Sequence, residues 1–282
     1  MSASDSVMRS IAQTFTPSKD ARSLVSFQRG SIKGWLETRL NLVSLFESGS
    51  WSHGTATTIS DVDYFAWLPA PRPQSAKSAM EKMRWELDFW YRDDSNVSVS
   101  VNHPAVRVRF RAPDMPDIEI VPAYWSSGDD YFIPDPAGGD GWIKSNPPAH
   151  KEYVDRAQKR DDRAKFLVRL MKGWVFMNQV PIRSLYLEMR AAKRVLDTPP
   201  VMPLHDVSWL LNDMASSRLA AMNDPSKYDG RRIAANDTPG ELLLALQKIE
   251  SARGIAARAL DYERNGWHSL MEHEVQSLFN LV

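Results

Sequence analysis

A glycine–serine pair and two closely spaced aspartates are the residues of this chain best suited to act together in chemistry. Gly49-Ser50 is separated by ten residues from Asp61 and Asp63, and these open the apolar and aromatic run at residues 62–68. Glycine lets a backbone approach phosphate oxygens closely, and serine adds a hydroxyl beside its own N–H. The pattern therefore predicts a phosphate-binding turn followed by a two-carboxylate metal site, as in enzymes that transfer nucleotidyl groups.

The two aspartates are expected to share one face of a strand, because side chains at i and i+2 point the same way. Carboxylates about 5 Å apart repel by roughly 3 kcal/mol at an effective dielectric of about 20, and a dication between them removes that cost. Mg²⁺, or Mn²⁺ in its place, suits carboxylate and phosphate oxygens. A third carboxylate on a neighbouring strand would complete a site for two ions, and both Asp117 and Glu119 are candidates.

The composition is that of a globular protein without a strong electrostatic bias. The 282 residues are 43% apolar, and 35 basic residues balance 35 acidic ones, so no overall field favours a long nucleic acid or a membrane surface. The absence of cysteine excludes disulfides and Cys-containing zinc modules. No apolar run approaches the roughly 18–20 residues of a membrane span, and the first residues have no signal-peptide pattern. We therefore expect a soluble, cytoplasmic protein.

The hydrophobic periodicity changes near residue 150. Before it, the pattern predicts helices over 31–45 and 76–91, strands over 62–68, 97–101, 106–110 and 117–121, and a long ordered crossing segment over 129–149. After it, the pattern predicts only helices, over 152–179, 183–193, 205–222, 240–263 and 267–281. We expect an α+β fold: a lobe at 1–150 with a mixed sheet and an N-terminal helix, a helical lobe at 151–282, and a cleft between them.

A cationic stripe on the first of these helices has two interpretations. Lys165, Arg169 and Lys172 are spaced i, i+4 and i+7, so they share one face. That face is either exposed to solvent or lines the cleft, where a lysine could meet a triphosphate as a point charge. The chain has no Walker-type loop, no dinucleotide-binding glycine motif and no nucleophile elbow.

In this order and combination the residues resemble the bacterial cGAS/DncV-like nucleotidyltransferases, also called CD-NTases or SMODS-type synthases. The resemblance is good over about residues 30–190 and looser beyond. One block is Gly49-Ser50 with Asp61-Val62-Asp63, and a second is the segment at 119–123, which is similar to the third-carboxylate strand of the family. The third block is a succession of segments at 131–135, 141–147, 150, 170–174 and 183–188.

The resemblance implies a polymerase-β-like catalytic lobe joined to a helical lobe, with nucleotides bound between them. It implies that two metal ions are held by Asp61, Asp63 and Glu119. Many family members have aspartate as the third ligand, so Asp117 is the alternative to Glu119. Gly49 and Ser50 match positions that bind donor phosphates. Two further positions, Lys172 and Ser184, match residues that contact phosphates from the helical lobe.

The activity implied by the resemblance is synthesis of a cyclic di- or trinucleotide from nucleoside triphosphates, with release of pyrophosphate. In the family this product activates a downstream effector in anti-phage (CBASS) defence, and a regulatory protein partner is an open expectation. One alternative is a nucleotidyltransferase that tails RNA or modifies a protein or small molecule. A second is a non-catalytic nucleotide sensor, against which the cluster of carboxylates argues.

Overall fold

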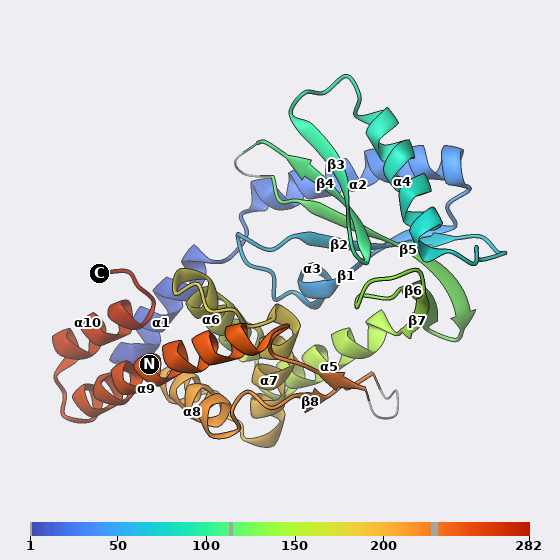
Figure 1. The fold of residues 1–282 in the computed structure, drawn as a ribbon. Coiled ribbons are helices and arrows are strands. Elements are labelled where there is room, and N and C mark those ends of the chain that lie inside the picture. Colours follow the sequence, from blue (N-terminus) through green and yellow to red (C-terminus); the bar gives the residue numbers. More distant parts are fainter. Residues whose placement is uncertain (1, 113–114, 227–230) are drawn as a thin grey trace. The chain divides into compact units, whose positions relative to one another are not determined.

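The computed structural model describes residues 2–112, 115–226 and 231–282, which form two compact units. One unit is Pro17–Lys151, and the other combines Met1–Thr16 with Glu152–Val282. Each unit has its own hydrophobic core and is described by itself (Figure 1). The predicted α+β class is confirmed, because a mixed sheet lies in the first unit and the second is mainly helical.

A single mixed sheet organises the unit Pro17–Lys151. Its central order is β1-β2-β5-β4-β3, with β6 pairing to β5 and β7 to β6. The β2–β5 pair is parallel and the other pairs are antiparallel. The strand bounds are β1 Ser44–Ser48, β2 Val62–Leu68, β3 Val97–Asn102, β4 Ala105–Phe110, β5 Ile118–Ser127, β6 Asp130–Pro134 and β7 Trp142–Ser145.

Two helices, α2 (Lys19–Leu40) and α4 (Ala76–Trp90), lie on one face of this sheet (Figure 1). Strand alternation turns Val62, Tyr64 and Ala66 of β2 toward this helical layer, and all three are fully buried. The residues between them, including Asp63, therefore project from the opposite face. That face is where side chains on β2 are available for chemistry.

Three sequence predictions in this unit are wrong. The helix predicted over 31–45 ends earlier, because Asn41 adopts a left-handed conformation (φ 52°) and caps α2, and β1 follows. The strand predicted to stop before Pro122 continues to Ser127 as β5. The segment 129–149, predicted to be a crossing segment with no strand or helix assigned, contains β6, β7 and the start of α5.

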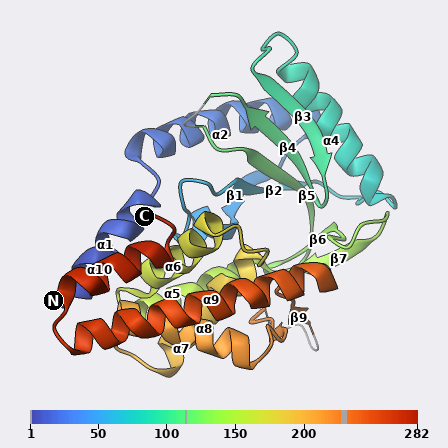
Figure 2. The same ribbon diagram turned by 60° about the vertical axis from the view of Figure 1, so that its left-hand side comes forward.

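The second unit is built from helices around the buried side chains of one large core. Figure 2 shows the longest helix, α9, lying along α8 and beside α10. The elements with a share in this unit are α1 Ala3–Thr14, α5 Pro147–Arg160, α6 Ala164–Met177, α7 Ser184–Asp197, α8 Pro203–Ser216, α9 Pro239–Arg264, α10 His268–Leu278, and the short strands β8 Met222–Asn223 and β9 Arg232–Ile233. A five-residue helix, α3 (Gly49–His53), belongs to the first unit.

The helix predicted over 152–179 is interrupted. The turn between α5 and α6 is held by Asp161, whose carboxylate accepts hydrogen bonds from the backbone N–H groups of Arg163 and Val201. These bonds lower the pKa of Asp161, although burial opposes them. A side chain that caps the backbone in this way competes with helix continuation, and periodicity alone does not reveal it.

The N-terminal segment does not belong with the sheet, as the expected 1–150 division had placed it. Met8, Ile11 and Phe15 are buried in the core of the helical unit. Gly173 on α6 makes room for the Phe15 ring, since a Cβ at Gly173 would lie 2.3 Å from that ring. Within the described residues, no helix is long and apolar enough to cross a membrane.

Candidate active site

Four residues form one row across the sheet, because β1, β2, β5 and β4 pair in register. Asp63 on β2 is the partner of Ser48 on β1 and of Glu119 on β5, and Glu119 is the partner of Arg107 on β4. Residues paired in this way lie on the same face of a sheet. The row therefore presents two carboxylates and a guanidinium side by side, facing away from Tyr64 and the core.

The other two acidic residues predicted for this site lie just before β2 and β5. The N–H of Val62 donates to the carbonyl oxygen of Asp117 at 2.9 Å. This bond extends the pairing of β2 with β5 by one residue. Asp61 and Asp117 precede Val62 and Ile118, the first pair of the parallel ladder. The structure thus gathers all four predicted acidic residues at the N-terminal ends of two neighbouring strands.

The Gly-Ser turn lies against one of these carboxylates. Gly49 follows β1 directly and has φ +59°, a conformation that glycine adopts without strain. A Cβ added at Gly49 would lie 2.0 Å from Oδ2 of Asp63, so only the missing side chain allows this approach. The backbone after Ser50 folds back, since the N–H of Thr55 donates to the Ser50 carbonyl oxygen at 2.9 Å. The predicted proximity of the turn to the aspartates is therefore observed for Asp63.

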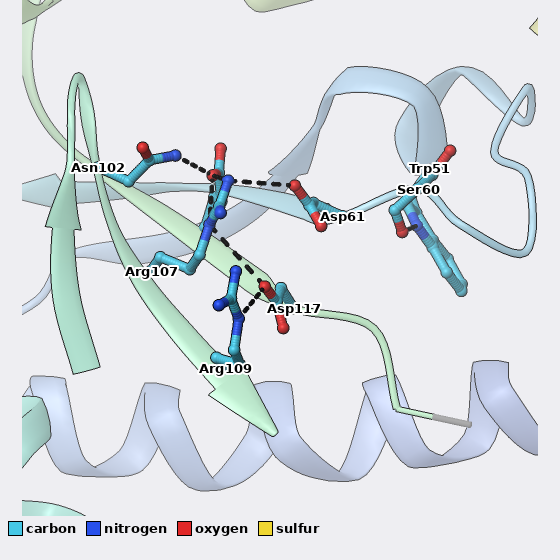
Figure 3. A network of polar contacts seen from close by, with 8 residues as sticks. Trp51, Ser60, Asp61, Asn102, Arg107, Arg109 and Asp117 are labelled. Carbon is cyan, nitrogen blue, oxygen red and sulfur yellow. Dashed lines mark hydrogen bonds and ion pairs between the residues drawn. The ribbon is translucent and has the colours of Figure 1, made fainter. Parts of the chain in front are cut away.

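Arg107 lies among the acidic side chains (Figure 3). Its Nη2 donates to Oε1 of Glu119 at 2.5 Å, and the same nitrogen lies 3.5 Å from Oδ2 of Asp61. Its Nε is 3.9 Å from Oδ2 of Asp117. Asn102 adds a hydrogen bond from Nδ2 to Oε1 of Glu119 at 2.6 Å. One guanidinium thus contacts three of the four carboxylates, and Glu119 most closely.

The surroundings of Asp61 disfavour its ionised form. Burial raises the pKa of Asp61 above its usual range, the negative charge of Glu119 raises it further, and Arg107 lowers it in part. A carboxyl with a raised folded-state pKa stabilises the fold at low pH, and that contribution is lost as the pH rises through this pKa. Groups with perturbed pKa values cluster at functional sites, which makes Asp61 a candidate functional residue.

The donor set fits a hard divalent cation in its chemistry. Carboxylate oxygens are the ligands that Mg²⁺ and Mn²⁺ take from proteins, and a single nitrogen of Arg107 already lies within reach of both Asp61 and Glu119. The guanidinium is therefore a stand-in cation at the point where these acids converge. As the side chains stand, no three carboxylates or histidines of the described segments are grouped tightly enough to hold an ion.

The two residues predicted to contact phosphates from the helical part lie in the second unit. Ser184 is the first residue of α7 and is exposed. Lys172 on α6 is buried, and its Nζ donates to Oε2 of Glu188 at 2.8 Å, with both side chains at most 4% exposed. The position of these residues relative to the carboxylates stays a prediction.

The Lys172–Glu188 pair predicts a structural penalty that is separate from any role with phosphate. We expect Lys172→Met to lower the free energy of unfolding by about 2–3 kcal/mol, because it removes the ammonium that pairs with the buried Glu188 carboxylate. The double variant Lys172→Met/Glu188→Leu should recover most of this loss. Urea denaturation of both variants measures it, and equal stability of the single and double variants would contradict the prediction.

Sequence reasoning did not find Arg107 or Asn102. The alternation in residues 105–110 does show that Arg107 and Arg109 share a face, and this signal was available. The pairing of Arg107 with Glu119 depends on the register between β4 and β5, which no local pattern encodes.

Comparison with known protein families finds a match over the first part of the sequence. Residues 1–157, a stretch that includes every residue of the row, match the Second Messenger Oligonucleotide or Dinucleotide Synthetase (SMODS) domain. A cyclic AMP-AMP-AMP synthase from Acinetobacter sp. is 29% identical over 179 residues, which are 60% of this chain. The chain spans about half the length of that curated relative, 50% of it.

Solved structures share the fold. CdnC from E. coli MS115-1, in a CdnC:HORMA-deltaN complex, superposes with a TM-score of 0.77 at 17% identity, over 98% of this chain and 96% of its own. The cyclic AMP-GMP synthase DncV from Vibrio cholerae, with the linear intermediate 5' pppA(3',5')pG, gives a TM-score of 0.64 at 13% identity, over 77% of this chain and 64% of its own. These likenesses confirm the expected polymerase-β-like fold.

Proposed function

We propose that this protein, which belongs to the SMODS family of second messenger oligonucleotide or dinucleotide synthetases, joins nucleoside triphosphates into a cyclic di- or trinucleotide. One observation carries the proposal: Asp63 and Glu119 are partners in the parallel β2–β5 ladder, with the Gly49 turn against Asp63. A phosphate-binding turn beside paired carboxylates is the arrangement that nucleotidyl transfer requires.

In this proposal each residue of the site has a defined task. Asp61, Asp63 and Glu119 would hold two Mg²⁺ or Mn²⁺ ions, which would supply positive charge to offset the triphosphate and the leaving pyrophosphate. The turn at Gly49 and Ser50 binds donor phosphates through backbone N–H groups and the serine hydroxyl. The rigid β2–β5 ladder keeps the carboxylates in position while a ribose hydroxyl attacks the α-phosphate and pyrophosphate leaves. This step is repeated until the ring closes.

The register between β2 and β5 favours Glu119 over Asp117 as the third metal ligand. Glu119 is the ladder partner of Asp63, whereas Asp117 lies two residues earlier, before the first residue of β5. The longer glutamate side chain adds one methylene of reach from its strand. In the helical unit, Lys172 and Ser184 are proposed to contact nucleotide phosphates.

The proposed partners follow from the family. Nucleoside triphosphates are the substrates, and the cyclic product activates an effector in anti-phage defence in the cytoplasm. CdnC has been solved with a HORMA protein, so we extend to this chain the proposal of a regulatory protein partner. The neutral overall charge makes long nucleic acid an unfavourable partner.

The test is a product analysis of the purified full chain with Mg²⁺ or Mn²⁺ and the four nucleoside triphosphates, each labelled in turn. We expect a labelled product that resists phosphatase and has the mass of a cyclic di- or trinucleotide. The same reaction is repeated with RNA and with a protein extract as acceptors. A linear or acceptor-linked product without any cyclic species would overturn the proposal in favour of nucleotide tailing or acceptor modification.

A further inference from the structure

We propose that Arg107 is an internal counter-ion: it neutralises Glu119 while the carboxylate site lacks a divalent cation, and it must release Oε1 of Glu119 when that oxygen binds the cation. The inference rests on the proposed function, because it concerns the same carboxylates. It assigns Arg107 a positioning role that controls how tightly the cation binds. Its basis is the contact geometry around one oxygen atom, Oε1 of Glu119.

That oxygen accepts hydrogen bonds from three donors. Arg107 donates through Nε at 2.9 Å and through Nη2 at 2.5 Å, and Asn102 donates through Nδ2 at 2.6 Å. A carboxylate oxygen has two lone-pair directions, so an oxygen with three donors has none left for a metal ion. Oε1 of Glu119 can therefore bind a metal ion, alone or together with Oε2, only after Arg107 gives up at least part of this contact.

The charges of the site also oppose simultaneous binding of Arg107 and a divalent cation to Glu119. The nitrogen that binds Glu119 is also the one 3.5 Å from Asp61, so it occupies the region between two proposed ligands. A guanidinium and a dication in that region would repel each other, and the side chain of Arg107 is only 25% exposed, which limits screening by solvent. The two cations therefore compete for Asp61 and Glu119.

A neighbouring arginine on the same strand provides a matched control. Arg109 also pairs with a carboxylate, since its Nε lies 3.0 Å from Oδ2 of Asp117. It is more exposed, at 58%, and its charge lowers the pKa of Asp61 less than the charge of Arg107 does. If Arg107 acts only through its charge, Arg109 should act similarly. If it acts by occupying Glu119, the two arginines should differ.

The experiment measures Mn²⁺ affinity directly, by the electron paramagnetic resonance signal of free Mn²⁺ during titration of the nucleotide-free full chain. We expect Arg107→Gln to bind Mn²⁺ about tenfold more tightly than the unsubstituted protein, because a competing charge-assisted contact is lost. Arg109→Gln should change the affinity by less than about twofold, since an exposed ion pair contributes little. Arg107→Lys, which keeps the charge without the fork of donors, should fall between them.

A second readout follows the metal-free protein. In EDTA the melting temperature of Arg107→Gln should lie below that of Arg109→Gln, because the carboxylates have lost their closest cation. Added Mn²⁺ should then raise the melting temperature of Arg107→Gln by more than it raises that of the unsubstituted protein. If Arg107→Gln does not fold, Arg107→Lys is compared with Arg109→Lys in both measurements.

The outcomes separate this inference from the proposed function. If Asp63→Asn abolishes Mn²⁺ binding but Arg107→Gln leaves the affinity unchanged or weaker, the counter-ion role is overturned and the synthase proposal stands. Equal gains in affinity for Arg107→Gln and Arg109→Gln would also overturn it, because general charge would then account for the effect. If Asp63→Asn binds Mn²⁺ as well as the unsubstituted protein does, both proposals fail.

Discussion

Asp63→Asn is expected to lower the rate of nucleotide synthesis by at least about a thousandfold while the protein keeps its fold. The amide has the shape of the carboxylate but no negative charge, so it cannot hold a divalent cation beside the triphosphate. Asp63 is the carboxylate in contact with the Gly49 turn and the ladder partner of Glu119. The measurement is the initial rate of product formation at saturating Mg²⁺, together with the thermal melting curve.

A pair of conservative variants serves as the control for this prediction and tests the third ligand. We expect Glu119→Gln to lose activity nearly as severely as Asp63→Asn, whereas Asp117→Asn should lose less than about tenfold. The reverse order would assign the third position to Asp117. If Asp63→Asn retains more than a tenth of the rate, the carboxylate row is not the catalytic site, whatever the other two variants do.

The candidate site could be predicted from the sequence because its signals are local. The alternation of Asp61, Asp63 and Phe65 with the buried residues Val62 and Tyr64 fixes which side chains share a face. A glycine immediately before a serine marks a tight turn in any fold. These features depend on neighbours along the chain, so they could be recognised without knowledge of how the strands pair.

The strand boundaries depend on pairing, and there the sequence was misleading. Pro122 was predicted to end its strand, but β4 pairs with β5 only as far as Ile120, and β6 pairs only from Tyr124 onward. Pro122 therefore lies between the β4 and β6 ladders on one edge of β5, with Ala66 of β2 as its partner on the other edge. A proline breaks a strand only where a partner needs its hydrogen, and only the register shows where that is.

The strands β6 and β7 were missed for a related reason. Each is short, and the loop between them contains Gly138 and Gly139, both with positive φ near 90°, which dominate the local pattern. Short strands beside glycines are stabilised by the sheet to which they add, in this case the far half of β5. The role of Arg107 was missed for the same reason, since it depends on Glu119, a partner on another strand.

Gly49→Ala is expected to reduce synthesis by about a hundredfold or more, although the substitution adds only one carbon atom. The new Cβ would lie 2.0 Å from Oδ2 of Asp63, a distance that no real contact shows, so the carboxylate or the turn must move. A displacement of about 1 Å in a catalytic group can lower a rate by about a hundredfold. The loss should appear in kcat more than in stability, which should fall by only about 1 kcal/mol from the strain at φ +59°.

Gly128 separates the two causes of that effect. It lies in the turn between β5 and β6 with φ +54°, close to the value at Gly49, but a Cβ there would meet nothing within 4 Å. Gly128→Ala should therefore have the same backbone strain and the same small loss of stability, with the rate of synthesis retained. Melting curves and initial rates of both variants provide the comparison.

If Gly49→Ala and Gly128→Ala are equally active, the closeness of the turn to Asp63 has no catalytic role. If only Gly49→Ala is inactive while both melt alike, the approach of the turn to Asp63 is the reason that glycine is required at this position.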